Sequence, residues 1–291
     1  MVGDDLSEPM GRDPLYVSAR RVLLDALEAL DNHRAAVVLV GAQAIYVYTG
    51  DLSEIQVAAF TLDADLIFNP LKLESEPHIE KMLRGAGFFP QRNDHGGINI
   101  GIWERTGATS TVDLLVPETV VGGGRRSANL GSQGDNLARR VQGLEAALVD
   151  QEPHVVASLD DTDLREFEIL IAGPAALLVA KTYKINERLQ QARRGGRGRQ
   201  KPKDALDCFR LLRAISTDDL TKRFTQISQD DRSRNVTKIA LGYLDTLFST
   251  EDGEGARLLA DAVGVGYEAE AVASCVRLTA DILKACRSLR D

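Results

Sequence analysis

Two aspartates separated by one residue are the part of this chain best suited to chemistry. Asp63 and Asp65 lie in residues 61–68, which read TLDADLIF. Because successive side chains of a β-strand point to opposite faces, both carboxylates and Thr61 would share one face. Carboxylates on one face repel each other unless a cation lies between them, and hard divalent cations prefer oxygen ligands. The pair therefore predicts a divalent metal that holds nucleotide phosphates, although a solvated strand end would have the same pattern.

A third aspartate occupies a comparable position farther along the chain. The apolar residues of STVDLLV, residues 110–116, alternate in a way that leaves Asp113 on the opposite face with Thr111. In displacement at the α-phosphate of a nucleoside triphosphate, two metal ions about 3.5–4 Å apart can stabilise the attacking and leaving oxygens. We expect Asp63, Asp65 and Asp113 to hold two divalent metal ions. An exposed strand face with no catalytic role is the alternative for Asp113.

Phosphate-binding features precede and follow these aspartates. Gly41 ends a short apolar run and would begin a helix, where unpaired backbone amides can receive phosphate. A helix expected from Pro174 to Leu189 carries basic side chains three and seven residues apart, which would share one face and meet a triphosphate. A plain strand-to-helix turn and a solvated basic face remain the alternatives. The basic residues of this helix are Lys181, Lys184 and Arg188.

The strongest positive cluster follows that helix. Residues 193–203 read RRGGRGRQKPK, with six cations, no acid and no aromatic residue that would stack on a base. The segment would bind the phosphates of an RNA backbone, or serve only as a solvated connection between helices. Asp204 and Asp207 follow at a helix start, where acids are favoured electrostatically without any catalytic role. The candidate RNA-binding residues are Arg193, Arg194, Arg197, Arg199, Lys201 and Lys203.

Composition limits the class of protein. A hydrophobic content of 44% over 291 residues, without a run long enough to span a bilayer, is typical of an ordinary globular protein. The net charge of −8 argues against indiscriminate coating of nucleic acid. The three cysteines are odd in number and fall in helical patterns, which predicts buried thiols in a reducing cytoplasm. The four histidines lack zinc spacing and are expected to be isolated surface or loop residues.

The hydrophobic pattern predicts an α+β fold, with a mixed sheet flanked by helices and then a helical region. We expect one domain over residues 1–172, of which 1–13 form a polar tail, and a helical domain over 173–291. Strands are expected over residues 36–40, 61–68, 98–102, 110–116 and 168–172. Helices are expected from Asp13-Pro14 onward and over residues 42–48, 75–84, 174–189, 204–215, 235–248, 255–263 and 268–289.

The order of these motifs resembles that of polymerase-β-like nucleotidyltransferases, most closely the AbiEii/MenT-type toxins of bacterial toxin–antitoxin systems. The similarity spans roughly residues 36–215 and rests on GAQA from Gly41, the three aspartates, Lys181, and KDALD from Lys203. It implies a minimal nucleotidyltransferase core, a helical C-terminal domain and a cleft between two lobes. It also implies magnesium, a nucleoside triphosphate substrate, the 3′ end of tRNA as acceptor, a block of translation, and a cognate antitoxin.

The resemblance assigns roles by position. It implies metal binding by the three aspartates, triphosphate contact by Lys181, and a functional acid at Asp204, with Asp207 as second choice. Residues expected to contact nucleotide are Gly41, Ala42, Thr61, Lys181, Lys184 and Asp207.

The chain departs from the family pattern in two places, because Ala42 replaces a frequent Gly or Ser and no arginine precedes Thr61. Either departure would mean a different nucleotide preference or weakened activity. Two alternatives stay open: transfer to a small molecule or a protein, and a catalytically silent relative that binds nucleotide, RNA or a partner protein.

Overall fold

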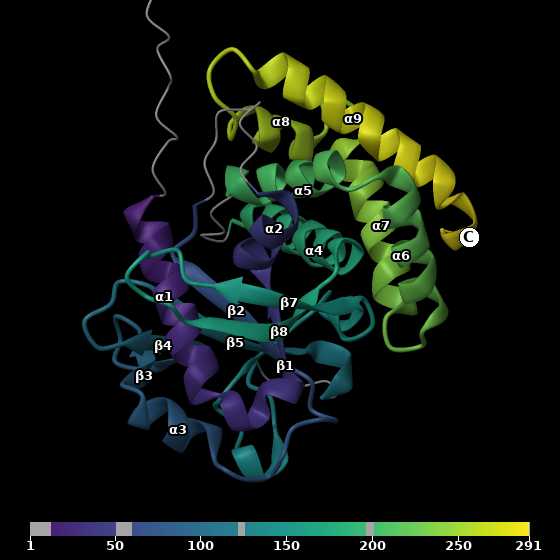
Figure 1. The fold of residues 1–291 in the computed structure, drawn as a ribbon. Coiled ribbons are helices and arrows are strands. Elements are labelled where there is room, and N and C mark those ends of the chain that lie inside the picture. The colour runs from purple at the N-terminus through teal and green to yellow at the C-terminus, as the bar shows by residue number, and fades with distance from the viewer. Residues whose placement is uncertain (1–12, 51–59, 122–125, 196–200, 291) are drawn as a thin grey trace, which may run out of the picture.

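The computed structural model of the protein describes residues 13–50, 60–121, 126–195 and 201–290. It has the predicted α+β architecture, in which a mixed eight-stranded sheet with helices is joined to a C-terminal helical region (Figure 1). Most of the tail predicted over residues 1–13 lies outside the described residues, and so do Arg197 and Arg199 of the basic segment.

The strands follow the order β3-β4-β5-β2-β1-β8-β7, with β6 paired to β5. At the centre, β2 is antiparallel to β1 and parallel to β5. Sequence patterns located the central strands, whereas β3, β6 and β7 were not predicted. The strands are β1 (Val37–Val40), β2 (Asp63–Phe68), β3 (Phe88–Arg92), β4 (Ile98–Arg105), β5 (Thr111–Pro117), β6 (Arg139–Val141), β7 (Gln151–Ala157) and β8 (Glu166–Ala172).

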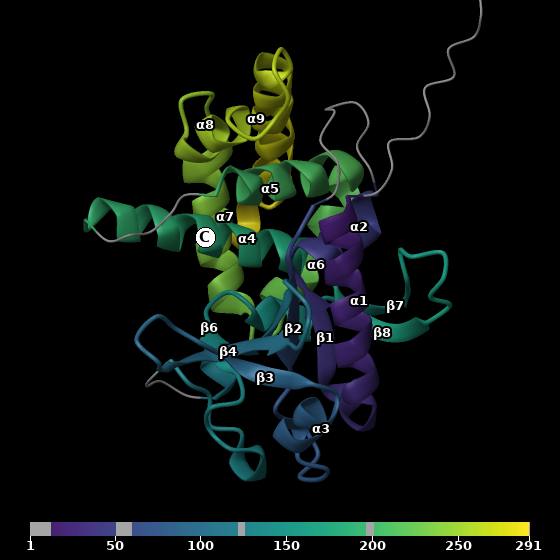
Figure 2. The same ribbon diagram turned by 90° about the vertical axis from the view of Figure 1, so that its left-hand side faces the viewer.

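The helices divide between the two regions. Helix α1 packs against β2 and β5 on one side of the sheet, whereas α4 to α9 gather above it (Figures 1 and 2). The helix predicted over residues 75–84 is only α3, and α6 was not predicted. The helices are α1 (Pro14–Ala29), α2 (Gly41–Thr49), α3 (Ile79–Gly85), α4 (Pro174–Arg193), α5 (Pro202–Ala214), α6 (Thr217–Gln229), α7 (Arg234–Phe248), α8 (Glu254–Ala260) and α9 (Glu268–Ala285).

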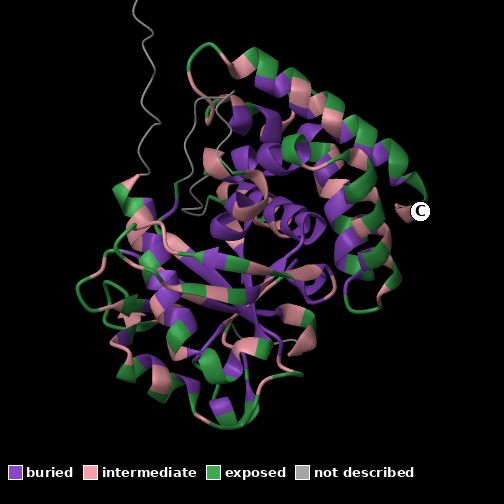
Figure 3. Cartoon of the chain, viewed as in Figure 1, coloured by how far each residue is buried: buried purple, intermediate pink, exposed green. Residues whose placement is uncertain are grey.

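One hydrophobic core runs through the sheet and the helical region, as the buried segments in Figure 3 show. Leu39 of β1, Ile45 of α2 and Phe209 of α5 all belong to it, and α2 contacts both α4 and α5. Helix α4 begins at Pro174, where the sequence predicts the second domain to begin. Independent folding of residues 1–172 and 173–291 stays a prediction.

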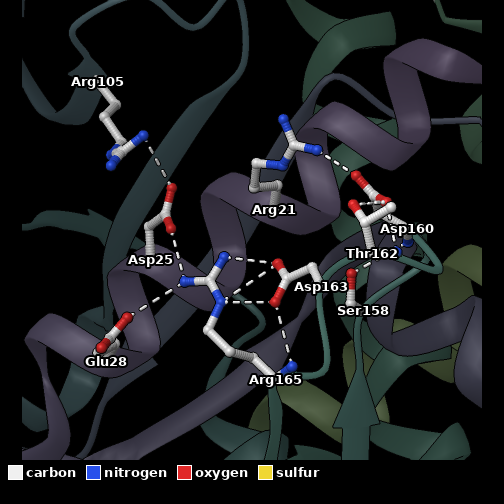
Figure 4. Close-up of polar contacts among 9 residues, drawn as sticks. All are labelled: Arg21, Asp25, Glu28, Arg105, Ser158, Asp160, Thr162, Asp163 and Arg165. Carbon is white, nitrogen blue, oxygen red and sulfur yellow. Dashed lines mark hydrogen bonds and ion pairs between the residues drawn. The ribbon is translucent and has the colours of Figure 1, made fainter.

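A network of ion pairs joins α1 to the turn between β7 and β8 (Figure 4). Arg165 donates to both carboxylate oxygens of Asp163 and, at 2.8 Å, to Asp25 of α1. Arg105 of β4 pairs with the second oxygen of Asp25 at 3.1 Å. The Arg165 side chain holds the pKa of Asp163 down at about 2. The network therefore ties the outer hairpin of the sheet to the helix that covers its centre.

Two predictions about isolated residues have different outcomes. All three cysteines are free and buried, as predicted. The prediction of a surface position is wrong for His33, which is only 2% exposed. Its Nε2 lies 2.7 Å from the Pro77 carbonyl oxygen. Among the described residues, no helix has the length and apolar character required to cross a membrane.

Candidate active site

The strand register brings Asp65 and Asp113 together at the centre of the sheet. Asp65 of β2 pairs with Asp113 of β5 in parallel register, so the two carboxylates share one face. Gly41, which follows β1 and begins α2, makes room for Asp65: a Cβ atom on this glycine would lie 2.0 Å from Asp65 Oδ2. Its φ of +73° also suits glycine. The predicted turn at Gly41 therefore serves the acidic site by allowing close approach of a carboxylate.

Asp63 is held by two neighbours. The Thr61 hydroxyl donates a 2.5 Å hydrogen bond to Asp63 Oδ1, and the Gln43 amide donates to the Asp63 carbonyl at 3.2 Å. Gln43 is itself fixed, since Arg20 Nε donates to its Oε1 at 2.8 Å and the side chain is 1% exposed. Sequence reasoning missed Gln43 as a positioning residue. The available signal was a polar residue on a short helix that is otherwise largely apolar and buried.

The three carboxylates have different electrostatic environments. Burial opposes ionisation of Asp63, but the Thr61 hydrogen bond and nearby lysines outweigh it and lower its pKa. Burial and the charge of Asp63 raise the pKa of Asp65. Burial and the charge of Asp65 raise the pKa of Asp113 to about 7, although Arg139 opposes this shift. Crowded carboxylates of this kind become favourable when a cation compensates their charge or when one of them takes up a proton.

The donor set suits a hard cation. Carboxylate oxygens are the ligands that Mg²⁺ prefers, and Asp65 has no hydrogen bond or ion pair with another described side chain. Within the described ranges, no group of three or more His, Cys, Asp or Glu side chains is placed to hold a metal ion without another ligand. Asp113 instead faces Arg139, whose Nη2 lies 3.2 Å from Asp113 Oδ2. The residues fit a metal that is also held by substrate phosphates.

A pocket of about 690 Å³ opens at Asp65 of β2, and residues of β1, β5, β6 and α4 also line it, whereas Asp63 and Asp113 are not among its lining residues. Its walls include six basic and only three acidic side chains, in a chain whose net charge is −8. A cationic pocket of this size suits a polyanionic ligand. Sequence reasoning missed half of the basic residues, and the adjacent arginines at 139 and 140 were the available signal. The basic side chains are Arg126, Arg139, Arg140, Lys181, Lys184 and Arg188.

Lys181 lies in this wall but is already paired. Its Nζ donates to Asp204 Oδ1 at 2.9 Å and to Asp207 Oδ2 at 2.6 Å, and all three residues are buried. Burial disfavours the lysine charge, but Asp207 outweighs it and raises the pKa of Lys181. Arg188 also pairs with Asp204. The predicted acids at the start of α5 thus order the basic face of α4, and contact of Lys181 with triphosphate stays a prediction.

Lys184 is the more accessible lysine of this face. Its side chain is 40% exposed, against 6% for Lys181, and its nearest acid is Asp204 at 4.0 Å. Burial and the charge of Lys181 lower the pKa of Lys184. The Lys184 charge acts on all three aspartates of the site: it contributes to the lowered pKa of Asp63 and opposes the raised pKa values of Asp65 and Asp113. Lys184 is thus available to a phosphate.

The described residues of the basic segment are spread over its two ends. Arg193 pairs with Glu254 of α8, whereas Arg194 is exposed at the end of α4. Lys201 is exposed, and Lys203 Nζ lies 5.9 Å from the centre of the Tyr46 ring. Burial lowers the pKa of Lys203 to about 8. None of these four described residues lines the pocket, so RNA binding by this segment stays a prediction.

A comparison with protein families agrees with this geometry. A family model described as nucleotidyltransferase matches residues 20–231. The chain belongs to the nucleotidyltransferase family. The matched segment contains all three aspartates and the basic face of α4, so this nucleotidyltransferase carries its candidate site within the family region. Membership makes it a transferase with a nucleoside triphosphate substrate. The comparisons with curated proteins and with solved structures found no match.

Proposed function

We propose that this nucleotidyltransferase is a magnesium-dependent enzyme that transfers a nucleotide to RNA through a two-metal reaction. The observation that carries the proposal is the register of Asp65 with Asp113 beside a cationic pocket. A hydroxyl oxygen of the acceptor forms a bond to the α-phosphorus. The bond from that phosphorus to the oxygen bridging the β-phosphate breaks, pyrophosphate leaves, and the hydroxyl proton passes to a base.

The residues divide this work. Asp63, Asp65 and Asp113 would hold Mg²⁺, which when bound stabilises the attacking and leaving oxygens. Gly41 lets Asp65 reach its position, and the hydrogen bond from Thr61 fixes the carboxylate of Asp63. Such rigid positioning contributes to catalysis because the reacting groups need little reorganisation.

The basic wall of the pocket would bind the triphosphate. Lys184 is partly exposed there, and Arg188 reaches the same wall from the next turn of α4. The Lys181 charge is oriented by Asp204 and Asp207, and it would stabilise negative charge on the triphosphate. Gly41 and Ala42 would offer the backbone amides at the start of α2.

The acceptor we propose is the 3′ end of tRNA, and the role is that of a toxin of the AbiEii/MenT type acting in the cytoplasm with a cognate antitoxin. The order of motifs supports this, as does the exposed basic residue Arg194 at the C-terminal end of α4. Phosphate contacts of this kind position a nucleic acid without reading its sequence.

The test is incubation of the purified protein with Mg²⁺, total tRNA and each nucleoside triphosphate labelled at the α-phosphate. We expect label in tRNA with wild type and with the distant control Asp163→Asn, and none with Asp65→Ala. Label in a protein or small molecule would replace RNA as the acceptor. No incorporation into any acceptor, together with triphosphate binding that needs neither Mg²⁺ nor Asp63, would identify a catalytically silent relative.

A further inference from the structure

Arg139 lies between an acid of the site and the basic pocket. Its Nη2 pairs with Asp113 Oδ2 at 3.2 Å, and its side chain lines the pocket and is 22% exposed. Its Nε is buried and has no hydrogen-bond partner among the described residues. The guanidinium is therefore only partly satisfied by Asp113, and it faces the space that we assign to the triphosphate.

The backbone is built to bring Arg139 to this position. Strand β6 begins at Arg139 and runs parallel to β5, where Arg139 pairs with Leu115. Gly101 of β4 makes room for it, with a φ of +78°. A Cβ atom on Gly101 would lie 2.7 Å from the Arg139 backbone nitrogen and 2.6 Å from the Leu114 carbonyl oxygen. The chain thus uses a glycine to place a cation beside Asp113.

A guanidinium and a divalent cation near one carboxylate repel each other. Like charges this close together at a protein surface repel each other, although solvent weakens the repulsion. Triphosphate oxygens remove this conflict, because they attract both cations and accept hydrogen bonds from a guanidinium. Bound triphosphate thus relieves the repulsion between the metal ion and the guanidinium.

We propose that Arg139 exchanges partners, pairing with Asp113 in the free enzyme and with the triphosphate once metal and nucleotide are bound. The inference rests on the proposed function. The exchange makes Arg139 oppose binding of metal alone and favour binding of triphosphate, so metal and triphosphate bind cooperatively. A merely structural ion pair would not affect the two ligands in opposite directions.

Calorimetric titration of the full chain tests the exchange with two probes: Mn²⁺ without nucleotide, and inorganic tripolyphosphate with saturating Mg²⁺. For Arg139→Gln we expect about fivefold tighter Mn²⁺ binding, because an ion pair that competes with the metal is removed. We expect about tenfold weaker tripolyphosphate binding, because a charge-assisted hydrogen bond is lost.

Two variants control for trivial effects. Arg140→Gln removes a neighbouring pocket cation that pairs with Glu118 at 3.1 Å, and its Mn²⁺ affinity should stay within about twofold of wild type. Arg139→Lys keeps the positive charge, so its affinities for Mn²⁺ and for tripolyphosphate should both lie close to those of wild type. Circular dichroism before and after titration shows that each variant is folded.

The outcomes separate the inference from the proposed function. Opposite shifts for Arg139→Gln, with rescue by lysine, support partner exchange. Shifts in the same direction, or no shift, with wild type binding both probes, overturn partner exchange and leave the proposed function standing. A wild-type protein that binds neither probe overturns the proposed function and the inference together.

Discussion

Replacing Asp113 by asparagine should stabilise the metal-free protein, although it removes a residue of the candidate site. Burial and the charge of Asp65 raise the pKa of Asp113 from 3.8 to about 7. An acid whose pKa is raised by folding makes its full contribution to the free energy of unfolding below the pKa that it has in the unfolded chain. That contribution is lost as the pH rises through the pKa that it has in the folded protein. Asparagine mimics the protonated acid and keeps that stability at every pH.

The magnitude follows from the shift. A difference of about three pKa units corresponds to about 4 kcal/mol at pH 8, at 1.36 kcal/mol per unit. At pH 5 the same calculation gives a stability gain for Asp113→Asn over wild type of only about 1.5 kcal/mol. For a chain of this size, the gain at pH 8 corresponds to a rise in Tm of about 8 °C.

The assay is thermal unfolding in EDTA at pH 5 and pH 8, followed by the fluorescence of Trp103. This single tryptophan is 2% exposed on β4, beside β5, so it reports on the sheet that carries Asp113. Added Mg²⁺ should raise the Tm of wild type and have little effect on the Tm of Asp113→Asn.

The control Asp163→Asn should lower the Tm instead of raising it. The hydrogen bonds from Arg165 lower the pKa of Asp163 to about 2, so the ionised form of Asp163 is the stabilising one. A Tm for Asp113→Asn at or below that of wild type at pH 8, or a gain that does not shrink at pH 5, refutes the reasoning.

Three further substitutions test the supports of the site and of the sheet. Gln43→Ala removes the closer of two side-chain donors to the Asp63 carbonyl, the other being the Thr61 hydroxyl at 3.5 Å; we expect a loss of about 1–2 kcal/mol in stability and a lower kcat, with tripolyphosphate affinity unchanged by calorimetry. Arg165→Met should return the pKa of Asp163 toward its ordinary value, measured by NMR titration, and an unchanged pKa would contradict the network of Figure 4. Gly101→Ala places a Cβ against backbone atoms at a positive φ, so we expect a loss of at least about 1–2 kcal/mol in a denaturant titration; wild-type stability would contradict this.

The sequence predicted the acidic centre of the fold because that part follows local rules. Alternation in residues 61–68 and 110–116 placed all three aspartates on polar strand faces, and Gly41 ended a buried strand. Strand β2 begins at Asp63, so Thr61 precedes it and supports Asp63 through its hydroxyl. These features depend on one strand and its immediate neighbours along the chain.

The basic wall could not be predicted in the same way, because it depends on pairing between distant segments. Arg139 reaches Asp113 only because β6, three residues long, pairs with β5 after a long connection. The helical spacing of Lys181 indicated only that it lies on a basic helix face. In the structure the start of α5 packs against this face, and Asp204 and Asp207 pair with Lys181. Periodicity detects a helix face, but it does not identify the partner that neutralises it.

The central claim is that the carboxylates beside the basic pocket transfer the α-phosphate with its nucleoside. The most direct measurement follows a nucleoside triphosphate that carries separate labels on its α- and γ-phosphates, incubated with Mg²⁺ and tRNA. The account predicts α-label in the acceptor, γ-label in pyrophosphate, and loss of both products with Asp65→Asn but not with Asp163→Asn. Transfer of the γ-label to the acceptor, or undiminished transfer by Asp65→Asn, would contradict it.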